Sequence, residues 1–440
     1  MQNLKKNLRE FFKDHFLIII MIAILAILKI IATVKLGVNY NINSDDVSYM
    51  ISGHTFAKNG TITMHGTLSA QIMPLMPIFI GLISYIFGEK YLFVLVLKIL
   101  WGLFGLLTPI FVYKSVRMFW DSPYAAISGI FFFLPNVLWA DNIILTETPF
   151  LLLLSMMIYY TFKYGEEKKN KDFIFLLITY LLALGLKANI GIYPLFAGIY
   201  FLFKGHNFLD LLKKGIISLI VLLMFIVPWT IRNYKIFNTF VPLTYGVGNP
   251  KLLGTYQGKG YPKDEELDYN KNVYDVATEK YAKYHKEDGS IEPHLQRYVL
   301  LEIDNIKANY RMKKWKETNF KSMIYSYLIY KPVYMVGSVF YWGHFFKYDT
   351  ALVRIVSYVE LFINIILGIY ILLKRKHSKD ILFLAILYII NIYIYAMTFS
   401  FSRYAYSLLP IRYILFGILV GEFFKIIQEK YLNKKSTTKS

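Results

Sequence analysis

The sequence contains no cysteine. This absence excludes disulfide bonds and thiolate metal sites, and it leaves the redox compartment undetermined. The chain also lacks a glycine-rich nucleotide-binding fingerprint, a serine nucleophile elbow and internal repeats. Of the eight histidines, only His54 and His65 lie near the acidic pair at positions 45 and 46, and their spacing matches no common metal-ligand motif. We therefore predict no histidine-based metal site.

Acidic residues are scarce: 29 Asp and Glu stand against 49 Lys and Arg, which gives a net charge of +20. In a soluble protein such a charge would suggest nucleic-acid binding. This chain, however, is 56% hydrophobic with a mean hydropathy of +0.42, far too apolar for a soluble domain of 440 residues. Its lysines stand between apolar runs, where anionic lipid headgroups and the positive-inside bias account for them. The composition predicts an integral membrane protein with no nucleic-acid partner.

The apolar residues come in runs of about 18 to 25, the length that a helix needs to cross roughly 30 Å of hydrocarbon. We therefore predict an all-α polytopic membrane protein. The first run is long and lacks a small-residue cleavage site, so we interpret it as a retained span rather than a signal peptide. Assigning the basic clusters to the cytoplasm places both termini there. The predicted crossings, about ten, lie near residues 16–35, 91–113, 123–140, 148–164, 173–187, 190–203, 215–230, 352–373, 380–397 and 408–426.

Residues 71–88 are apolar but are not predicted to cross the membrane. The segment has two prolines and only about 18 residues, and a crossing here would place every later basic cluster on the wrong side. We interpret it as a juxtamembrane helix at the outer interface. Residues 320–346 are ambiguous, because Pro332 and the aromatic flanks favour an interfacial helix over a crossing without excluding one.

This threading divides the chain into three parts. Residues 1–230 form a transmembrane module whose first outer loop is 36–90. Residues 231–350 form a large outer region, and residues 351–440 contain the last transmembrane helices and a cytoplasmic tail. A polar segment with helical apolar spacing, 294–315, lies in the outer region.

The ionisable residues that solubility does not explain all fall at the outer face. An ionisable group at a helix end near the bilayer is costly, so a functional site is the default hypothesis. Simpler interpretations remain open: a lysine can snorkel to the interface, an arginine can mark a helix end, and two adjacent acids can be solvated or can cap a helix with Ser44. The residues concerned are Asp45, Asp46, Glu147, Lys187, Arg232 and Arg403.

These residue types suit chemistry with a phosphoryl leaving group. One acid of the pair would accept a proton from an attacking hydroxyl, and the other would orient the substrate or fix its neighbour's ionisation. Glu147 would be a second acid, while Lys187, Arg232 and Arg403 would hold a phosphate at the membrane surface. No cofactor is certain; a possible divalent cation bound by carboxylates stays open.

Five short motifs resemble the GT-C superfamily of membrane glycosyltransferases, specifically the bacterial relatives of protein O-mannosyltransferases (glycosyltransferase family 39) and of the lipid A aminoarabinose transferase. The resemblance is good over residues 1–255 and around 400–425, and weak between them. The motifs are "SDDVSYMISGHTFAKNG" at 44–60, "MPLMPIFIGLISYIFG" at 73–88, "LTETPF" at 145–150, "LALGLKANIGIYP" at 182–194 and "PWTIRN" at 228–233. The segment "SRYAYSLLP" at 402–410 is also similar to the family's pattern.

The resemblance implies a GT-C fold and the transfer of a sugar from a polyprenyl-phosphate carrier to a hydroxyl, usually with inversion. By position it implies that Asp45 is the catalytic base, Asp46 its acidic neighbour, Glu147 the second acid and Lys187 a phosphate-side residue. Two further residues, Tyr49 and Asn233, are the substrate-orienting candidates within the matched motifs. One departure is that the aminoarabinose transferase has a phosphate-binding lysine where Met73 precedes Pro74 here.

We therefore expect an enzyme of the cell membrane with its active site on the extracytoplasmic side. Its partners would be a lipid-linked sugar donor, the bilayer and an acceptor. The acceptor would be an envelope glycan or a lipid. A protein acceptor is less expected, because the downstream domain of protein mannosyltransferases is missing. The alternatives are a flippase or transporter of lipid-linked sugars and a cell-surface glycan polymerase. A flippase would place ionisable residues at the bilayer midplane and show inverted repeats, and a polymerase would not require the acid pair.

Overall fold

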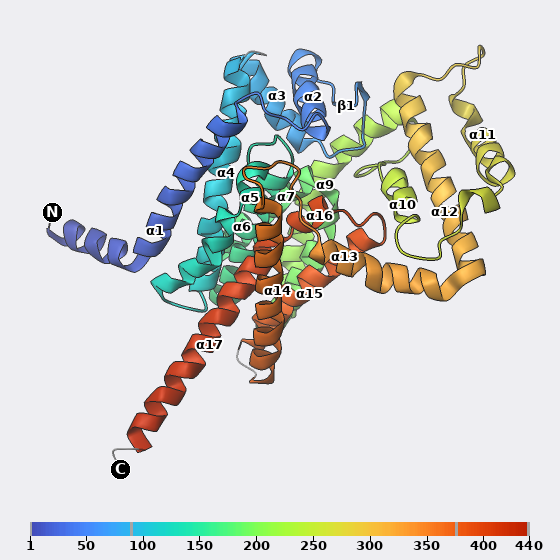
Figure 1. The fold of residues 1–440 in the computed structure, drawn as a ribbon. Coiled ribbons are helices and arrows are strands. Elements are labelled where there is room, and N and C mark those ends of the chain that lie inside the picture. The colour runs from blue at the N-terminus through green and yellow to red at the C-terminus, as the bar shows by residue number, and fades with distance from the viewer. Residues whose placement is uncertain (1, 89–90, 375–376, 438–440) are drawn as a thin grey trace.

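The computed structural model describes residues 2–88, 91–374 and 377–437. The described chain is built almost entirely of helices, with one short pair of strands (Figure 1). Every predicted crossing coincides with helical structure. These elements are α1 (Gln2–Leu36), α4 (Tyr91–Arg117), η1 (Pro123–Phe133), α5 (Pro135–Ala140), α6 (Glu147–Glu167), α7 (Asn170–Leu186), η2 (Ala188–Ile192), α8 (Tyr193–Phe203), α9 (Phe208–Phe237), α14 (Asp349–Leu373), α15 (Ser378–Ala396) and α17 (Leu409–Thr437).

Five of these helices are long and apolar enough to cross a membrane, judged within the described ranges by length and composition. They comprise residues 10–36 of α1 and the whole of α4, α9, α14 and α15. An all-α polytopic membrane fold is thereby confirmed. The other five predicted crossings lie on helices that are shorter, broken or more polar, and the number ten stays a prediction.

The predicted span 123–140 is not one continuous α-helix. It is an 11-residue 3₁₀-helix, η1, followed after Leu134 by the six-residue α5. Pro135 has no N–H to donate, so it begins a new helix rather than continuing η1. Because a 3₁₀-helix rises about 2.0 Å per residue and an α-helix about 1.5 Å, the two pieces together measure about 31 Å when placed end to end. This segment can therefore match the thickness of the hydrocarbon with only about 18 residues.

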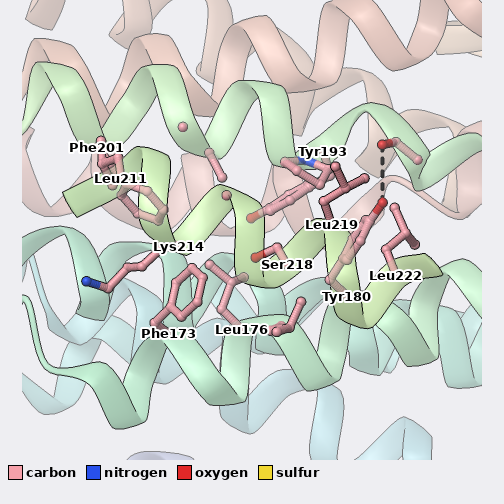
Figure 2. A pocket seen from close by; sticks show the side chains of 16 residues that line it. Phe173, Leu176, Tyr180, Tyr193, Phe201, Leu211, Lys214, Ser218, Leu219 and Leu222 are labelled. Atoms are coloured by element: carbon pink, nitrogen blue, oxygen red, sulfur yellow. Dashed lines mark hydrogen bonds between the residues drawn. The ribbon is translucent and has the colours of Figure 1, made fainter. Parts of the chain in front are cut away.

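The centre of the bundle is formed where α6 packs against α4 and α7, and where α17 crosses α4, η1 and α6. Large side chains fill this core, including the fully buried Trp101, Trp139, Phe150 and Phe162. The helix α9 is different, because none of the 18 residues of its most apolar window is buried. It packs only lightly on α7 and α8 and leaves an apolar groove of about 340 Å³ beside them, with Lys214 at one end and Tyr180 toward the other (Figure 2).

The first outer loop folds into two helices that pack on each other, α2 (Asp45–Asn59) and α3 (Leu75–Phe87), joined through the strands β1 (Thr63–Met64) and β2 (Thr67–Leu68). The strands pair antiparallel with Thr63 opposite Leu68. A Cβ atom on Gly53 would lie 2.3 Å from Ile80, so glycine is what lets α2 and α3 approach. At 13 residues α3 is about 20 Å long, too short to cross the membrane, as predicted for residues 71–88.

Residues 231–350, the region predicted to lie outside, sit to one side of the bundle (Figure 1). Its long helix α12 (Pro293–Tyr325) packs against α10 (Gly248–Gly254) and bends at Asn319, whose φ and ψ of −151° and 65° are not helical. The chain continues through η6 (Ser326–Tyr330) and α13 (Lys331–Gly337), whose course in Figure 1 runs across α14 rather than along it. Whether residues 320–346 cross the membrane stays a prediction. The remaining elements are η3 (Asp264–Glu266), η4 (Asn270–Tyr274), α11 (Asp275–Tyr281), η5 (Ala282–Tyr284) and α16 (Ser402–Tyr406).

Candidate active site

Four ionisable residues from distant parts of the sequence meet where helices begin or end. Asp45 is the first residue of α2, Glu147 is the first residue of α6, and Lys187 follows the last residue of α7. Arg403 lies in the short helix α16, 358 residues after Asp45. Each stands where a helix begins or ends, so its polar side chain can point out of the apolar interior while the helix keeps its backbone hydrogen bonds.

Arg403 connects the two acids. Its Nη1 donates to Asp45 Oδ2 and its Nε donates to Glu147 Oε1, each at 2.7 Å. Lys187 Nζ donates to the same Glu147 oxygen at 2.7 Å and to Ser407 Oγ at 3.0 Å. The cluster therefore contains two acids and two bases, and its formal charge is zero. Charge-assisted hydrogen bonds of this kind are short and strong, so they fix the positions of the side chains.

The four residues line a cavity of about 540 Å³ but differ in their exposure. The side chain of Asp45 is 32% exposed, whereas that of Glu147 is 2% exposed. Arg403 and Lys187 are intermediate, at 12% and 11%. Asp45 is thus the carboxylate of this cluster that a substrate in the cavity can reach, while Glu147 holds the two bases in place.

Burial and the ion pairs act in opposite directions on Arg403. Burial alone lowers its pKa, but the neighbouring Glu147 and Asp45 raise the pKa above the ordinary value for arginine. Burial also raises the pKa of Tyr49, which lines the same cavity from α2. The guanidinium is therefore charged and the phenol is neutral at any physiological pH, so Tyr49 is available as a neutral hydrogen-bonding group beside Asp45.

Asp46 points away from this cavity. Adjacent residues of a helix do not share a face, and Asp46 is 1% exposed and accepts hydrogen bonds from the backbone N–H of Ile42 at 2.7 Å and of Ser44 at 3.0 Å. It thereby fixes the turn that enters α2 and orients Asp45. The Ser44 side chain makes no capping hydrogen bond, so the acid pair and Ser44 do not form the simple helix cap considered from the sequence.

Arg232 and Asn233 are not brought to the cavity. Arg232 donates to the carbonyls of Ser69 at 2.7 Å and Ile62 at 3.1 Å, and its guanidinium lies over the ring of Trp229. Asn233 is fully buried and donates to the carbonyl of Val241. Both residues connect α9 to neighbouring loops, so the structure gives them a positioning role in place of the predicted contacts with phosphate and substrate.

Other residues at the site were not found from the sequence. Ser407, which binds Lys187, lies in the "SRYAYSLLP" motif and could have been included with Arg403. Behind Glu147, Asp141 pairs with Lys29 and accepts from Thr148 at 2.9 Å. No local pattern marks Lys29, because its partner is 112 residues away. The cavity is completed by Gln71, Met73, Thr146, Leu243, Gly246, Pro250, Tyr395, Thr398 and Tyr404, among others.

The residues present do not form an evident metal site. Within the described ranges no group of three or more His, Cys, Asp or Glu side chains is arranged to hold a metal ion. The two acids of the cavity, Asp45 and Glu147, both already bind Arg403, so a divalent cation would have to displace these ion pairs. The cation considered from the sequence stays an untested prediction.

Comparison with known proteins gives a family match for part of the chain. Residues 71–231 match the model of the dolichyl-phosphate-mannose-protein mannosyltransferase family. This stretch contains Glu147 and Lys187, whereas Asp45 and Arg403 lie outside it. No curated protein matches the chain.

Two solved proteins have a distantly similar shape. ArnT from Cupriavidus metallidurans, bound to undecaprenyl phosphate, is 14% identical with a TM-score of 0.41, and the match covers 92% of this chain and 78% of that one. The Archaeoglobus fulgidus oligosaccharyltransferase, tethered to an acceptor peptide, is 13% identical with a TM-score of 0.41 over 96% of this chain and 51% of that one. The family match to residues 71–231 confirms, over that part of the chain, the resemblance to the GT-C membrane glycosyltransferases.

Proposed function

We propose that this protein transfers a sugar from a polyprenyl-phosphate carrier to an acceptor hydroxyl, with inversion, at the outer face of the cytoplasmic membrane. The observation that carries the proposal is the partly exposed Asp45 carboxylate, held by an arginine whose other partner is the buried Glu147. The family model supports a lipid-phosphate donor, because its name describes a sugar on such a carrier.

Asp45 acts as the general base. In the transfer step the acceptor oxygen forms a bond to the anomeric carbon, its proton passes to Asp45, and the bond from the anomeric carbon to the phosphate oxygen breaks with its electron pair remaining on the phosphate. Attack from the side opposite the leaving phosphate inverts the anomeric centre. A base within hydrogen-bond reach of the attacking hydroxyl contributes typically about 10² to 10⁴ in rate.

Arg403 and Lys187 stabilise the leaving phosphate. Arg403 uses Nε and Nη1 for the two acids, and its Nη2 has no hydrogen-bond partner among the described residues. When Asp45 takes up the proton it loses its charge, so the cluster changes from neutral to +1 as the phosphate gains one negative charge. The positive charge thus develops where the transition state needs it, which is the condition for electrostatic catalysis.

The second outer region supplies part of the cavity wall and, in this proposal, selects the acceptor. Val247 and Pro250, in and beside α10, line the cavity together with the acids. Close packing fixes α10 there, because a Cβ atom on Gly248 would lie 1.9 Å from the carbonyl of Leu301 in α12. An acceptor would therefore approach between α10 and α2. We place both termini in the cytoplasm and this region outside.

The test is an in vitro transfer assay on purified protein with radiolabelled polyprenyl-phosphate sugars, with and without a chelator. Wild type is expected to release free polyprenyl phosphate, and Asp45→Asn is expected to bind the donor but release about 10² to 10⁴ times less. Asp275→Asn, a change at an exposed acid of α11, is the matched control and should behave as wild type. If wild type and Asp45→Asn are both inert with every donor, yet both move labelled lipid across liposomes, the protein is a flippase.

A further inference from the structure

A second polar cluster lies inside the membrane bundle, away from the candidate active site. Glu360 of α14 and Arg412 of α17 form an ion pair in which both side chains are at most 6% exposed. Asn364, one helical turn after Glu360, donates to Glu360 Oε1 at 2.6 Å and to the carbonyl of Arg412 at 3.3 Å. Ionisable groups at this depth are costly and generally mark a functional site.

The cluster opens on a cavity of about 780 Å³, larger than the one at the active site. It lies between α14 and α15, which both rest on α17 but touch each other much less, and α13 closes one end. Apolar side chains dominate the wall, and several of them, such as Ile365, Ile369 and Ile389, are about half exposed on the surface of predicted membrane spans. The two cavities share no lining residue. Such a cavity is accessible from the hydrocarbon of the bilayer.

One polar atom of the cavity wall, Asn364 Oδ1, is buried without a hydrogen-bond partner among the described residues. The Tyr388 hydroxyl and the Arg412 guanidinium lie in the same wall and are placed to pair with each other. Leaving a buried polar atom unpaired is costly, so Asn364 Oδ1 calls for a bound donor. An amide oxygen only accepts, so a hydroxyl group that donates to it would satisfy it.

We propose that this cavity binds a neutral lipid that carries a free hydroxyl group, of the diacylglycerol type. The ion pair of Glu360 and Arg412 cancels its own charge, so the site offers no net positive charge to a phosphate. The apolar wall takes the hydrocarbon chains, and the volume lies within the range of about 300 to 1,000 Å³ found for small-molecule sites. The lipid hydroxyl donates to Asn364 Oδ1.

Native mass spectrometry of the full-length protein with 1,2-dioleoylglycerol tests this site, with dioleoyl phosphatidic acid, which has the same chains and a phosphate, as the comparison. One diacylglycerol is expected to bind per protein, about tenfold or more tightly than phosphatidic acid. Asn364→Leu should weaken diacylglycerol binding about tenfold. Gly368→Leu should weaken diacylglycerol binding at least as much, because the added side chain fills part of the cavity that Gly368 lines. The leucine is accommodated without a clash, because a Cβ atom at this position meets only Leu419, at 3.9 Å.

Asn391→Leu is the matched control. Asn391 is a buried asparagine of α15 that also has an unpaired Oδ1 but does not line the cavity, and its replacement should leave diacylglycerol binding unchanged. Melting temperatures of all three variants identify any loss that is due to unfolding. The proposal is overturned if wild type binds no diacylglycerol, if phosphatidic acid binds as tightly, or if folded Asn364→Leu and Gly368→Leu bind diacylglycerol as wild type does. In the first of these cases water, not a lipid hydroxyl, is the partner of Asn364 Oδ1.

Discussion

Replacing Arg403 with lysine tests whether the bridge between the two acids is required for activity. Arg403 reaches Asp45 and Glu147 with two different nitrogens, each at 2.7 Å. Lysine keeps the charge but has a single nitrogen on a flexible chain, so it cannot reproduce the fork. We expect it to keep one of the two acids, and Glu147 is the better partner because it is buried.

The magnitude follows from the hydrogen bond that is lost. A hydrogen bond to a charged group contributes about 1.5 to 3 kcal/mol. If this contribution acts on the transition state, through the orientation of Asp45 and the contact with the leaving phosphate, turnover falls by about 10- to 150-fold. Arg403→Gln removes the charge as well, but Glu147 keeps Lys187, so the variant should lose less stability than the about 3 to 5 kcal/mol of a buried charge left without a partner.

The assay measures the release of polyprenyl phosphate at saturating donor, together with the melting temperature of each variant. Arg354→Lys, an arginine-to-lysine change at an exposed position of α14, is the control and should retain full turnover. The reasoning is refuted if Arg403→Lys turns over within twofold of wild type. A decrease that only reflects unfolded protein would appear as a lowered melting temperature, with normal turnover per folded molecule.

Three further predictions concern residues around the site. Asp141→Asn should destabilise the protein by about 3 to 5 kcal/mol, because it leaves Lys29 buried without its carboxylate. Adding Lys29→Met to this variant should restore much of the stability, as measured by urea titration. Equal stability of the single and double variants would contradict the pairing argument. Gly254→Ala should lower the melting temperature, since its Cβ would lie 1.9 Å from the carbonyl of Thr398, while Gly215→Ala, with nothing within 4 Å, should not. Arg232→Lys should lower the melting temperature with an unchanged KM for the donor; a raised KM would return Arg232 to the phosphate site.

The sequence determined the class of protein and most of the residues of the site. The apolar runs define membrane helices because a backbone in hydrocarbon must satisfy its own hydrogen bonds. The cost of burying charge marks Asp45, Glu147, Lys187 and Arg403 from their positions in the sequence, and these four do meet in one cavity. Local chemistry is enough for such conclusions, because an ionisable residue beside an apolar run can be recognised from the sequence before its partner is known.

The tertiary structure decided which of these side chains pair with each other. Asp45 and Asp46 have the same chemistry in the sequence, but the orientation of α2 turns one to the cavity and the other to its own backbone. Arg232 lies near the end of α9 and Arg403 in the first turn of α16. The backbone carbonyls of Ile62 and Ser69 occupy Arg232, whereas Arg403 faces carboxylates. The pairing of Glu360 with Arg412 is likewise set by how α14 and α17 pack. Hydrogen bonds act over about 3 Å, and only the folded chain brings residues so far apart in sequence to that distance.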